Sequence, residues 1–428
     1  MKKTLVTIIA LVLCGTGAFA QEAKKENKAS VSLHGFIRNF YTYDTRECVA
    51  GTEDFFMYLP KDVNMKGDTD LNAQSSFRTA ALTSRFWIEA KGYEYEGIKM
   101  GARIEADFYS GLSGVSGTAT LRMRQAFVTL DKNRWNLKLG QAWHPLAADL
   151  PDVFSLNSGS PFNPFSRSPQ LAVNYNLGEG LSLTGTLLWQ MQYNSTGPVG
   201  KSANYIKYGK TPELYLGLNY SKGALLARAG LDVLSIKPRW NDGKKKVSDR
   251  ITTFSPFLYL QYRQGLLSLK FKTVFAEAGE HLNLNGGYGI HKILDDGNYT
   301  YTPSRNSSSW FNIAYGSKLQ AVFFAGYCKN FGTKESLLED PSQPGFSSSF
   351  YFGSTSFSNM NQMWRVQPAM IYNLGKLAIG LELEVTRVQY GEYKSGDVKY
   401  VNASNALVTD NLHWVTNKRV QALVKYTF

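Results

Sequence analysis

The dominant pattern along the chain is an alternation of apolar and polar residues. In residues 98–108, Ile, Met, Ala, Ile, Ala and Phe occupy every second position, and most positions between them carry a charge. Residues 181–192, 377–386 and 419–428 show the same period. A period of two places the apolar side chains on one face of an extended strand and the polar side chains on the other. The sequence therefore predicts an all-β protein.

Sixteen stretches show this alternation, and the connections between them are alternately short and long. The seven short connections have one to three residues and are typical of tight hairpin turns. Of the eight long ones, the first covers residues 44–78 and the third covers residues 145–168. The predicted strands are residues 31–43, 79–95, 97–109, 119–131, 134–144, 169–176, 180–192, 211–221, 224–237, 251–263, 266–277, 308–316, 318–329, 361–373, 376–390 and 414–428.

Strand length and loop alternation together favour a transmembrane antiparallel β-barrel. Strands of soluble sheets have a typical length of about five or six residues, whereas a transmembrane strand needs about nine to eleven. Outer-membrane barrels have short periplasmic turns and long extracellular loops. Sixteen strands close without a free edge and leave an aqueous lumen. A soluble two-sheet protein with one wet face would explain the alternation but not the strand lengths or the loop pattern.

The two ends of the chain are consistent with export to the outer membrane. Lys2 and Lys3 precede a short apolar stretch, and Ala18-Phe19-Ala20 matches a cleavage site, as in a secretory signal peptide. The terminal Phe428 lies on the lipid-facing parity and resembles the assembly signal of bacterial barrels. The predicted organisation is a signal peptide at 1–20, a flexible tail at 21–29 and a barrel at 30–428.

Composition narrows the functional classes. The 428 residues carry a formal net charge of +13, with 43% apolar, 19% charged and 14% aromatic residues. A mean hydropathy of −0.27 is too polar for a bundle of membrane helices. The basic residues alternate with apolar ones instead of clustering on a helix, so the charge does not indicate nucleic-acid binding. Cys48 and Cys328 are far apart in the sequence, and we expect free thiols.

If the apolar parity faces lipid, the polar parity lines the lumen, and this lining is basic. Arg122 and Arg124 are alternate residues, so both point to one face about 6.8 Å apart at roughly 3.4 Å per residue. Arg85 and Arg103 have the same parity on the two preceding strands. A wall of guanidiniums favours anions in a pore. The alternative is a set of salt bridges with Glu89, Glu105 and Asp107 that holds the lining together.

The third long loop differs from the others in composition. It contains PLAADLPDVFSLNSGSPFNPFSRS, which is apolar, aromatic and rich in proline. Because such a loop would be unfavourable in water, we expect it to fold into the barrel mouth. There Asp149 and Asp152 would face the basic wall and set a constriction, and Arg167 would anchor the loop or add positive charge. The alternative is a loop packed against a neighbouring subunit.

Four motifs resemble a known family, the DcaP-like outer-membrane porins, which are related to the phosphate-selective porins. They are SLHGFIRNFYTYDTR (32–46), LRMRQAFVTL (121–130), LGQAW (139–143) and PFNPFSRSPQLAVNY (161–175). The resemblance implies a trimeric sixteen-stranded diffusion channel with a constricting third loop and a preference for small anionic solutes. It makes Arg38, Arg122, Arg124 and Arg167 candidate constriction residues. Residues 21–29 are too short for the helical segment that such porins can carry, so trimerisation would rest on the barrel wall.

The sequence shows no catalytic or cofactor motif. It has no CxxC pair, HExxH, Walker loop or G-x-S-x-G elbow. The five histidines are scattered and none has metal-ligand spacing, so we expect neither a metal site nor a cofactor. The Asp cluster in DDGNYTYTP (295–303) lacks the full EF-hand pattern for calcium. The resulting hypothesis is a non-enzymatic porin for small hydrophilic solutes, with an outer-membrane enzyme (protease or lipase) or an adhesin as alternatives.

Overall fold

The computed structural model describes residues 29–109, 119–353, 359–392 and 400–428. The predicted signal peptide and nearly all of the predicted tail lie outside these residues, so both stay predictions. No helix in the described part of the chain is long and apolar enough to span a membrane.

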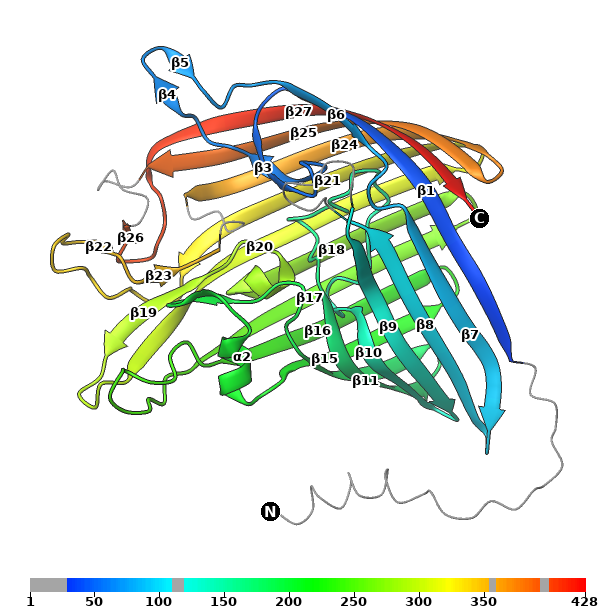
Figure 1. The fold of residues 1–428 in the computed structure, drawn as a ribbon, viewed down its shortest axis with the longest axis horizontal. Coiled ribbons are helices and arrows are strands. Elements are labelled where there is room, and N and C mark those ends of the chain that lie inside the picture. The colour runs from blue at the N-terminus through cyan, green and yellow to red at the C-terminus, as the bar shows by residue number, and fades with distance from the viewer. Residues whose placement is uncertain (1–28, 110–118, 354–358, 393–399) are drawn as a thin grey trace.

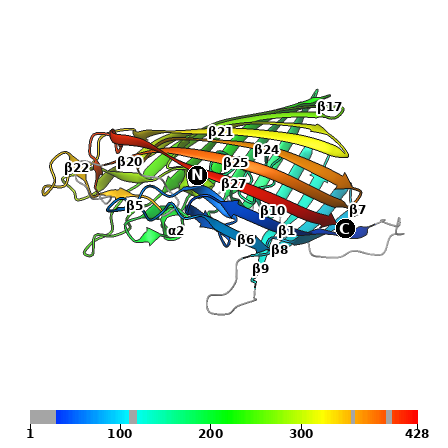
Figure 2. The ribbon, with the colours of Figure 1, turned by 90° about the horizontal axis from the view of Figure 1, so that it is seen from above.

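The chain forms a closed antiparallel barrel of sixteen strands, as predicted. Consecutive strands pair with each other, and the first strand closes the barrel by pairing with the last, from Phe36 opposite Thr427 to Asp44 opposite Arg419. Figure 2 shows these two strands side by side. The barrel strands are β1 (Ser30–Asp44), β7 (Arg85–Tyr95), β8 (Ile98–Phe108), β9 (Leu121–Lys132), β10 (Trp135–Trp143), β11 (Arg167–Gly178), β12 (Leu181–Leu188), β15 (Glu213–Lys222), β16 (Leu225–Ile236), β17 (Ile251–Gln264), β18 (Leu267–Glu277), β20 (Tyr299–Gly316), β21 (Leu319–Thr333), β24 (Met360–Leu374), β25 (Leu377–Glu392) and β27 (Asp410–Thr427).

The tight turns and the long connections lie at opposite ends of the barrel (Figure 1). In the turn between β7 and β8, Glu96 and Gly97 both have positive φ, 49° and 74°, which matches the twist of a two-residue hairpin. The long connections carry short elements of their own: β2 (Cys48–Gly51), β3 (Phe56–Pro60), β4 (Met65–Lys66), β5 (Thr69–Asp70), β6 (Ser76–Ala80), β13 (Thr196–Gly197), β14 (Gly200–Lys201), α2 (Asn204–Gly209), η1 (Gly279–Leu282), β19 (Tyr288–Ile293), β22 (Phe346–Ser347), β23 (Phe350–Tyr351) and β26 (Val401–Asn402).

Two of the predicted strands are wrong in extent. The stretch 79–95 is divided into β6 and β7. β6 pairs with residues 40–44 of β1, and β7 pairs with residues 30–36 of the same strand. The strand is interrupted at residues 81–84, where Thr83 adopts a φ of 66°. The strand predicted at 308–316 begins at Tyr299 as β20. The other predicted strands agree with the observed bounds to within four residues.

The exterior of the barrel is apolar and the interior is polar. On β25, Ile379, Leu381 and Leu383 are 44%, 52% and 46% exposed, whereas the intervening Glu382 and Glu384 are each 1% exposed. This inverts the arrangement of a soluble protein and suits strands whose outer face meets lipid. The predicted transmembrane barrel, of the kind found in the bacterial outer membrane, is therefore confirmed.

Two long connections fill much of the interior. The third loop folds inward as predicted, and its Phe154, Phe162 and Phe165 are buried. The first loop also folds inward, although neither its length nor the alternation pattern around it predicted this. Its segment FFMYLP (55–60) is buried throughout and packs in the same apolar cluster. That uninterrupted apolar run was the signal that would have identified it.

Charged side chains of the barrel wall hold both loops in place. The Glu382 carboxylate accepts the backbone N–H groups of Phe154 and Ser155 at 2.8 and 3.0 Å. The Arg365 guanidinium donates to the carbonyls of Ser160 and Tyr58, both at 2.8 Å, and so binds the third and first loops together. Hydrogen bonds with the loop backbone satisfy both charges. A buried charge requires such hydrogen-bond partners.

Aromatic rings of the third loop occupy positions where the wall has glycine. A Cβ on Gly380 would overlap the ring of Phe154, and one on Gly326 would overlap the ring of Phe162. The absence of a side chain at each glycine therefore leaves a space that holds a ring of the loop, and we call this space its seat. Cys48 and Cys328 are free thiols, as predicted.

Replacing Gly380 with Val should displace Phe154 from its seat. We expect a loss of about 1–3 kcal/mol in unfolding free energy, which is typical of overpacking. The temperature at which the compact band of the folded barrel disappears on a denaturing gel measures the loss. Gly185→Val is the matched control, because a Cβ there has its nearest neighbour, Leu216 Cδ2, at 3.8 Å. Equal losses in the two variants would contradict the proposed seat.

Candidate functional site

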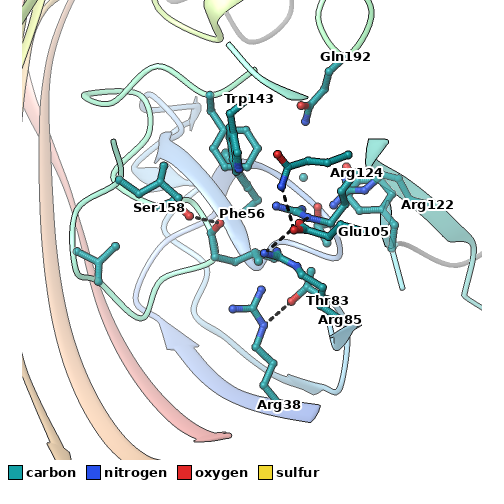
Figure 3. A pocket seen from close by; sticks show the side chains of 18 of the residues that line it. Arg38, Phe56, Thr83, Arg85, Glu105, Arg122, Arg124, Trp143, Ser158 and Gln192 are labelled. Atoms are coloured by element: carbon teal, nitrogen blue, oxygen red, sulfur yellow. Dashed lines mark hydrogen bonds and ion pairs between the residues drawn. The ribbon is translucent and has the colours of Figure 1, made fainter. Parts of the chain in front are cut away.

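The basic residues predicted on neighbouring strands meet at one cavity inside the barrel. Arg85 (β7), Arg103 (β8), Arg122 and Arg124 (β9) all line this cavity, and Arg38 (β1) lines it from the adjoining strand. Figure 3 shows four of these guanidiniums, Arg38, Arg85, Arg122 and Arg124, around the carboxylate of Glu105. The cavity has a volume of about 370 Å³. The first and third loops form its other side, so the space left open in the barrel runs along the basic wall.

Two buried carboxylates pair with the wall. Glu105 lies 3.5 Å from Arg85, 2.5 Å from Arg103 and 2.6 Å from Arg124. Asp107 accepts two hydrogen bonds from Arg122, both at 3.0 Å, and one from Arg124 at 2.9 Å. The salt bridges considered as an alternative are therefore present. They fix the guanidiniums in position, because two nitrogens of Arg122 and two of Arg124 bond to carboxylate oxygens.

The carboxylates do not neutralise the wall. Arg103 also pairs with Glu89 at 2.8 Å, which completes the acidic partners of the cluster. Among the described residues, no carboxylate lies within 4 Å of Arg38 or Arg167. Six guanidiniums thus face three carboxylates, with a formal excess of three positive charges. Lys425 of β27 also lines the cavity and adds to this excess.

A β-bulge in β9 sets the direction of two side chains in the wall. Gln125 pairs with Glu105 and Met123 pairs with Ala106, so Arg124 is an extra residue in the ladder. As a result Arg124 and Gln125, although adjacent in sequence, both reach Glu105, at 2.6 and 2.9 Å. Bulges often re-aim side chains next to functional sites. Simple alternation would have placed Gln125 on the lipid side.

The break between β6 and β7 positions Arg38. Its Nε donates to the Thr83 hydroxyl at 2.7 Å, and its backbone N–H donates to the Ser84 hydroxyl at 3.1 Å. The guanidinium carbon lies 5.1 and 5.0 Å from the ring centres of Phe36 and Phe40. Neutral partners hold this side chain, so its charge stays available to the cavity.

Arg167 ends the third loop and is almost fully buried. Its guanidinium packs over the rings of Trp143 and Phe165, at 4.7 and 5.2 Å. It lines a second cavity of about 340 Å³. This cavity shares Arg122, Tyr109, Gln192 and Tyr193 with the first. Arg167 therefore both anchors the loop and adds positive charge beside the wall.

The expectation for Asp149 and Asp152 is wrong in its geometry. Neither residue lines the cavity against the basic wall. Asp149 lies 3.2 Å from Arg228 of β16, and Asp152 lies 2.7 Å from Lys270 of β18. These lysine and arginine side chains stand on strands on the far side of the third loop. The two aspartates therefore tie the loop to the wall behind it.

The loop side of the cavity is neutral. The first loop contributes Phe56 and Tyr58, and the third contributes Leu150, Val153 and Leu156. Burial raises the pKa of Tyr58, and it also raises the pKa of Tyr193, to which Tyr58 is hydrogen-bonded. Both phenols, which lie outside the barrel strands, thus remain protonated and uncharged. The cavity has one cationic side and one neutral side.

Three solved structures share the fold over nearly the whole chain. The outer membrane channel DcaP of Acinetobacter baumannii has a TM-score of 0.64 at 18% identity, covering 96% of this chain and 100% of that one. An anion-selective porin from Comamonas acidovorans has a TM-score of 0.55 at 12% identity, covering 94% and 100%. OmpF of Salmonella typhi, in complex with daunomycin, has a TM-score of 0.51 at 10% identity, covering 95% and 100%.

At these identities the likeness establishes the fold. The resemblance to DcaP-like porins is confirmed at that level, and the barrel is a porin-type barrel. No protein-family model matches the chain, and no curated protein matches it.

Removing the charge of Glu105 should destabilise the barrel. Glu105→Gln leaves the almost fully buried Arg124 with one acidic partner fewer, and breaking a buried ion pair costs about 3–5 kcal/mol. Thermal unfolding of the detergent-solubilised barrel measures the loss. Glu89→Gln is the control, since Glu89 is more exposed and contacts Arg103 and Lys91 at the edge of the cluster. A larger loss for Glu89→Gln would contradict this account.

Proposed function

We propose that the protein is an outer-membrane porin that passes small hydrophilic solutes by diffusion and favours anions. The observation that carries the proposal is the excess of guanidiniums over carboxylates on one side of the cavity, with Arg38 and Arg167 outside the ion pairs. The porin-type fold supports a channel over the enzyme and adhesin alternatives. Arg38, Arg85, Arg103, Arg122, Arg124 and Arg167 are the proposed constriction residues, and Asp149 and Asp152 are not.

The two sides of the cavity would act together on a passing solute. The loop side of the cavity carries no charge, and behind it lies the apolar cluster of the protein interior, where the dielectric constant is low. Charges on the opposite wall are therefore less screened than in bulk water, which raises the local concentration of anions. The guanidinium fork matches carboxylate and phosphate oxygens. The ion pairs with Glu105 and Asp107 keep the wall ordered without cancelling its charge.

The assembly and the export route belong to the same proposal. We propose a homotrimer embedded in the outer membrane, as the resemblance to DcaP-like porins implies. Residues 1–20 would direct export and be removed, and residues 21–29 would form a tail. The transport needs no cofactor or energy source, because diffusion follows the concentration gradient.

Removing the charge of Arg38 should weaken anion preference. A unit charge about 8 Å from an ion in water attracts an anion and repels a cation by about 0.5 kcal/mol each, so Arg38→Gln should lower the anion-to-cation permeability ratio about sixfold. The reversal potential of a planar bilayer under a salt gradient measures this ratio. Lys222→Gln is the matched control, since Lys222 loses the same charge in an exposed turn, where it pairs with Glu179 at 2.7 Å.

Three results would contradict the proposal in different ways. Cation preference in the unmodified protein would keep the porin and remove the role of the basic wall. An equal shift for Lys222→Gln would show that net charge, and not position, sets selectivity. A folded barrel that conducts no ions would exclude a diffusion pore.

A further inference from the structure

One stretch of the barrel beside the basic wall lacks strand pairing. On one side, β9 pairs with β8 from Leu121 opposite Phe108 onward. On the other side, its pairing with β10 begins only at Ala126, which lies opposite Gln141. Among the described residues, those at 121–125 of β9 therefore have no partner strand on the β10 side. We call this gap, at the long-loop end of β9, the side window.

A side chain covers part of the unpaired edge, and a cavity occupies the rest. Gln141 Nε2 donates to the backbone carbonyl of Arg124 at 2.9 Å. The second cavity, of about 340 Å³, lies in the window and is lined by Met123 and Met191. These methionines are 47% and 51% exposed, so they reach the outer surface of the barrel. Arg122 lines both this cavity and the one at the basic wall. The window thus leads from the outer surface to the basic wall.

The window contains a buried cation without an anion. Arg167 lines it and is only 2% exposed, yet its Nη1 has no hydrogen-bond partner among the described residues. The guanidinium packs instead over the rings of Trp143 and Phe165. None of the residues that line this cavity is acidic. Because a buried charged group normally has hydrogen-bond partners, the orphan Nη1 indicates an anionic ligand.

The rest of the lining suits an apolar chain. Met123 and Met191 have flexible, polarisable side chains, which are common at surfaces that bind apolar groups of varied shape. Gln141 Oε1 also lacks a partner, and as an acceptor it suits a hydroxyl group or a water beside the ligand's head group. The cavity volume lies at the lower end of the range for small-molecule sites. Such a volume favours a ligand with one chain over a lipid with several.

We propose that the side window binds a single-chain amphipathic carboxylate, of the fatty-acid class. Its carboxylate pairs with Arg167 Nη1 in a charge-assisted hydrogen bond. Its chain leaves between Met123 and Met191 toward the outer surface, where the neighbouring Leu121 is 55% exposed. A second copy of the chain fits less well, because one of its carboxylates would have to reach an almost fully buried guanidinium.

The site would connect the membrane with the lumen, and this part of the inference rests on the proposed function. Tyr109, Arg122, Gln192 and Tyr193 line both cavities, so a molecule in the window lies next to the cavity at the basic wall. An amphipathic acid would therefore exchange between lipid and lumen through the side of the barrel. Small hydrophilic solutes would use the open end instead.

Calorimetric titration of the purified barrel in detergent with octanoate tests the proposal. Octanoate should bind at a single saturable site, at least about tenfold more tightly than acetate or octan-1-ol, which offer only the head or only the chain. Arg167→Gln should weaken octanoate binding about tenfold, because it removes a charged hydrogen-bond donor.

A charge placed at Met191 keeps the test decisive if Arg167→Gln fails to fold. Met191 lies in the connection after β12, outside the barrel strands. Met191→Lys should bind octanoate about sixfold more tightly than Met191→Glu, since charges of opposite sign would act on the carboxylate from about 8 Å. The same two substitutions at Met65, an exposed methionine of β4 in the first loop, are the matched control and should not differ.

The outcomes separate this site from the proposed pore. If octanoate binds no more tightly than acetate, or if the Met65 and Met191 pairs differ equally, the proposal is overturned, even if the barrel conducts ions. If octanoate binds as expected to a barrel that conducts no ions, the binding site stands and the diffusion pore is excluded.

Discussion

Lipid offers no hydrogen-bond partner to a backbone amide, so a strand that crosses a membrane must pair on both sides. The pairing of β1 with β27 meets this requirement for the whole sheet, because it joins the only two ends that consecutive hairpins leave open. Closure also separates two environments. One face of every strand meets lipid and is apolar, while the other faces a lumen in which charged side chains can be stabilised. The interior of this barrel is consequently rich in ionic groups.

Those interior charges determine where the lumen remains open. Lys272, Glu382 and Arg365 bind backbone atoms of the inserted loops, and aromatic rings of the third loop fill glycine positions in the wall. The loops thereby occupy one side of the lumen and leave space along β1 and β7 to β9. Charges on the occupied side act as anchors, whereas those on the open side line a cavity. The same residue types thus have different roles according to what packs against them.

On the open side, the groups that order the wall leave part of its positive charge uncancelled. Glu105 and Asp107 order the guanidiniums, and Arg38 and Arg167 are held by hydroxyl and aromatic partners instead of carboxylates. A wall with complete charge neutralisation would be ordered but would not attract anions. In a wall without carboxylates, repulsion between neighbouring guanidiniums would leave their side chains disordered. The observed excess of positive charge lies between these limits.

The sequence alone determined the barrel, because period-two alternation and alternating connection lengths are local properties that each strand carries by itself. It also placed Arg85, Arg103, Arg122 and Arg124 on the inner face and predicted the insertion of the third loop from its composition. Only the tertiary structure decided the partners. Asp149 and Asp152 bind Arg228 and Lys270 of the wall behind the third loop, the bulge at Arg124 turns Gln125 inward, and His144 lies beside His281. These contacts join residues distant in sequence, and they depend on strand register and loop packing, which alternation does not encode.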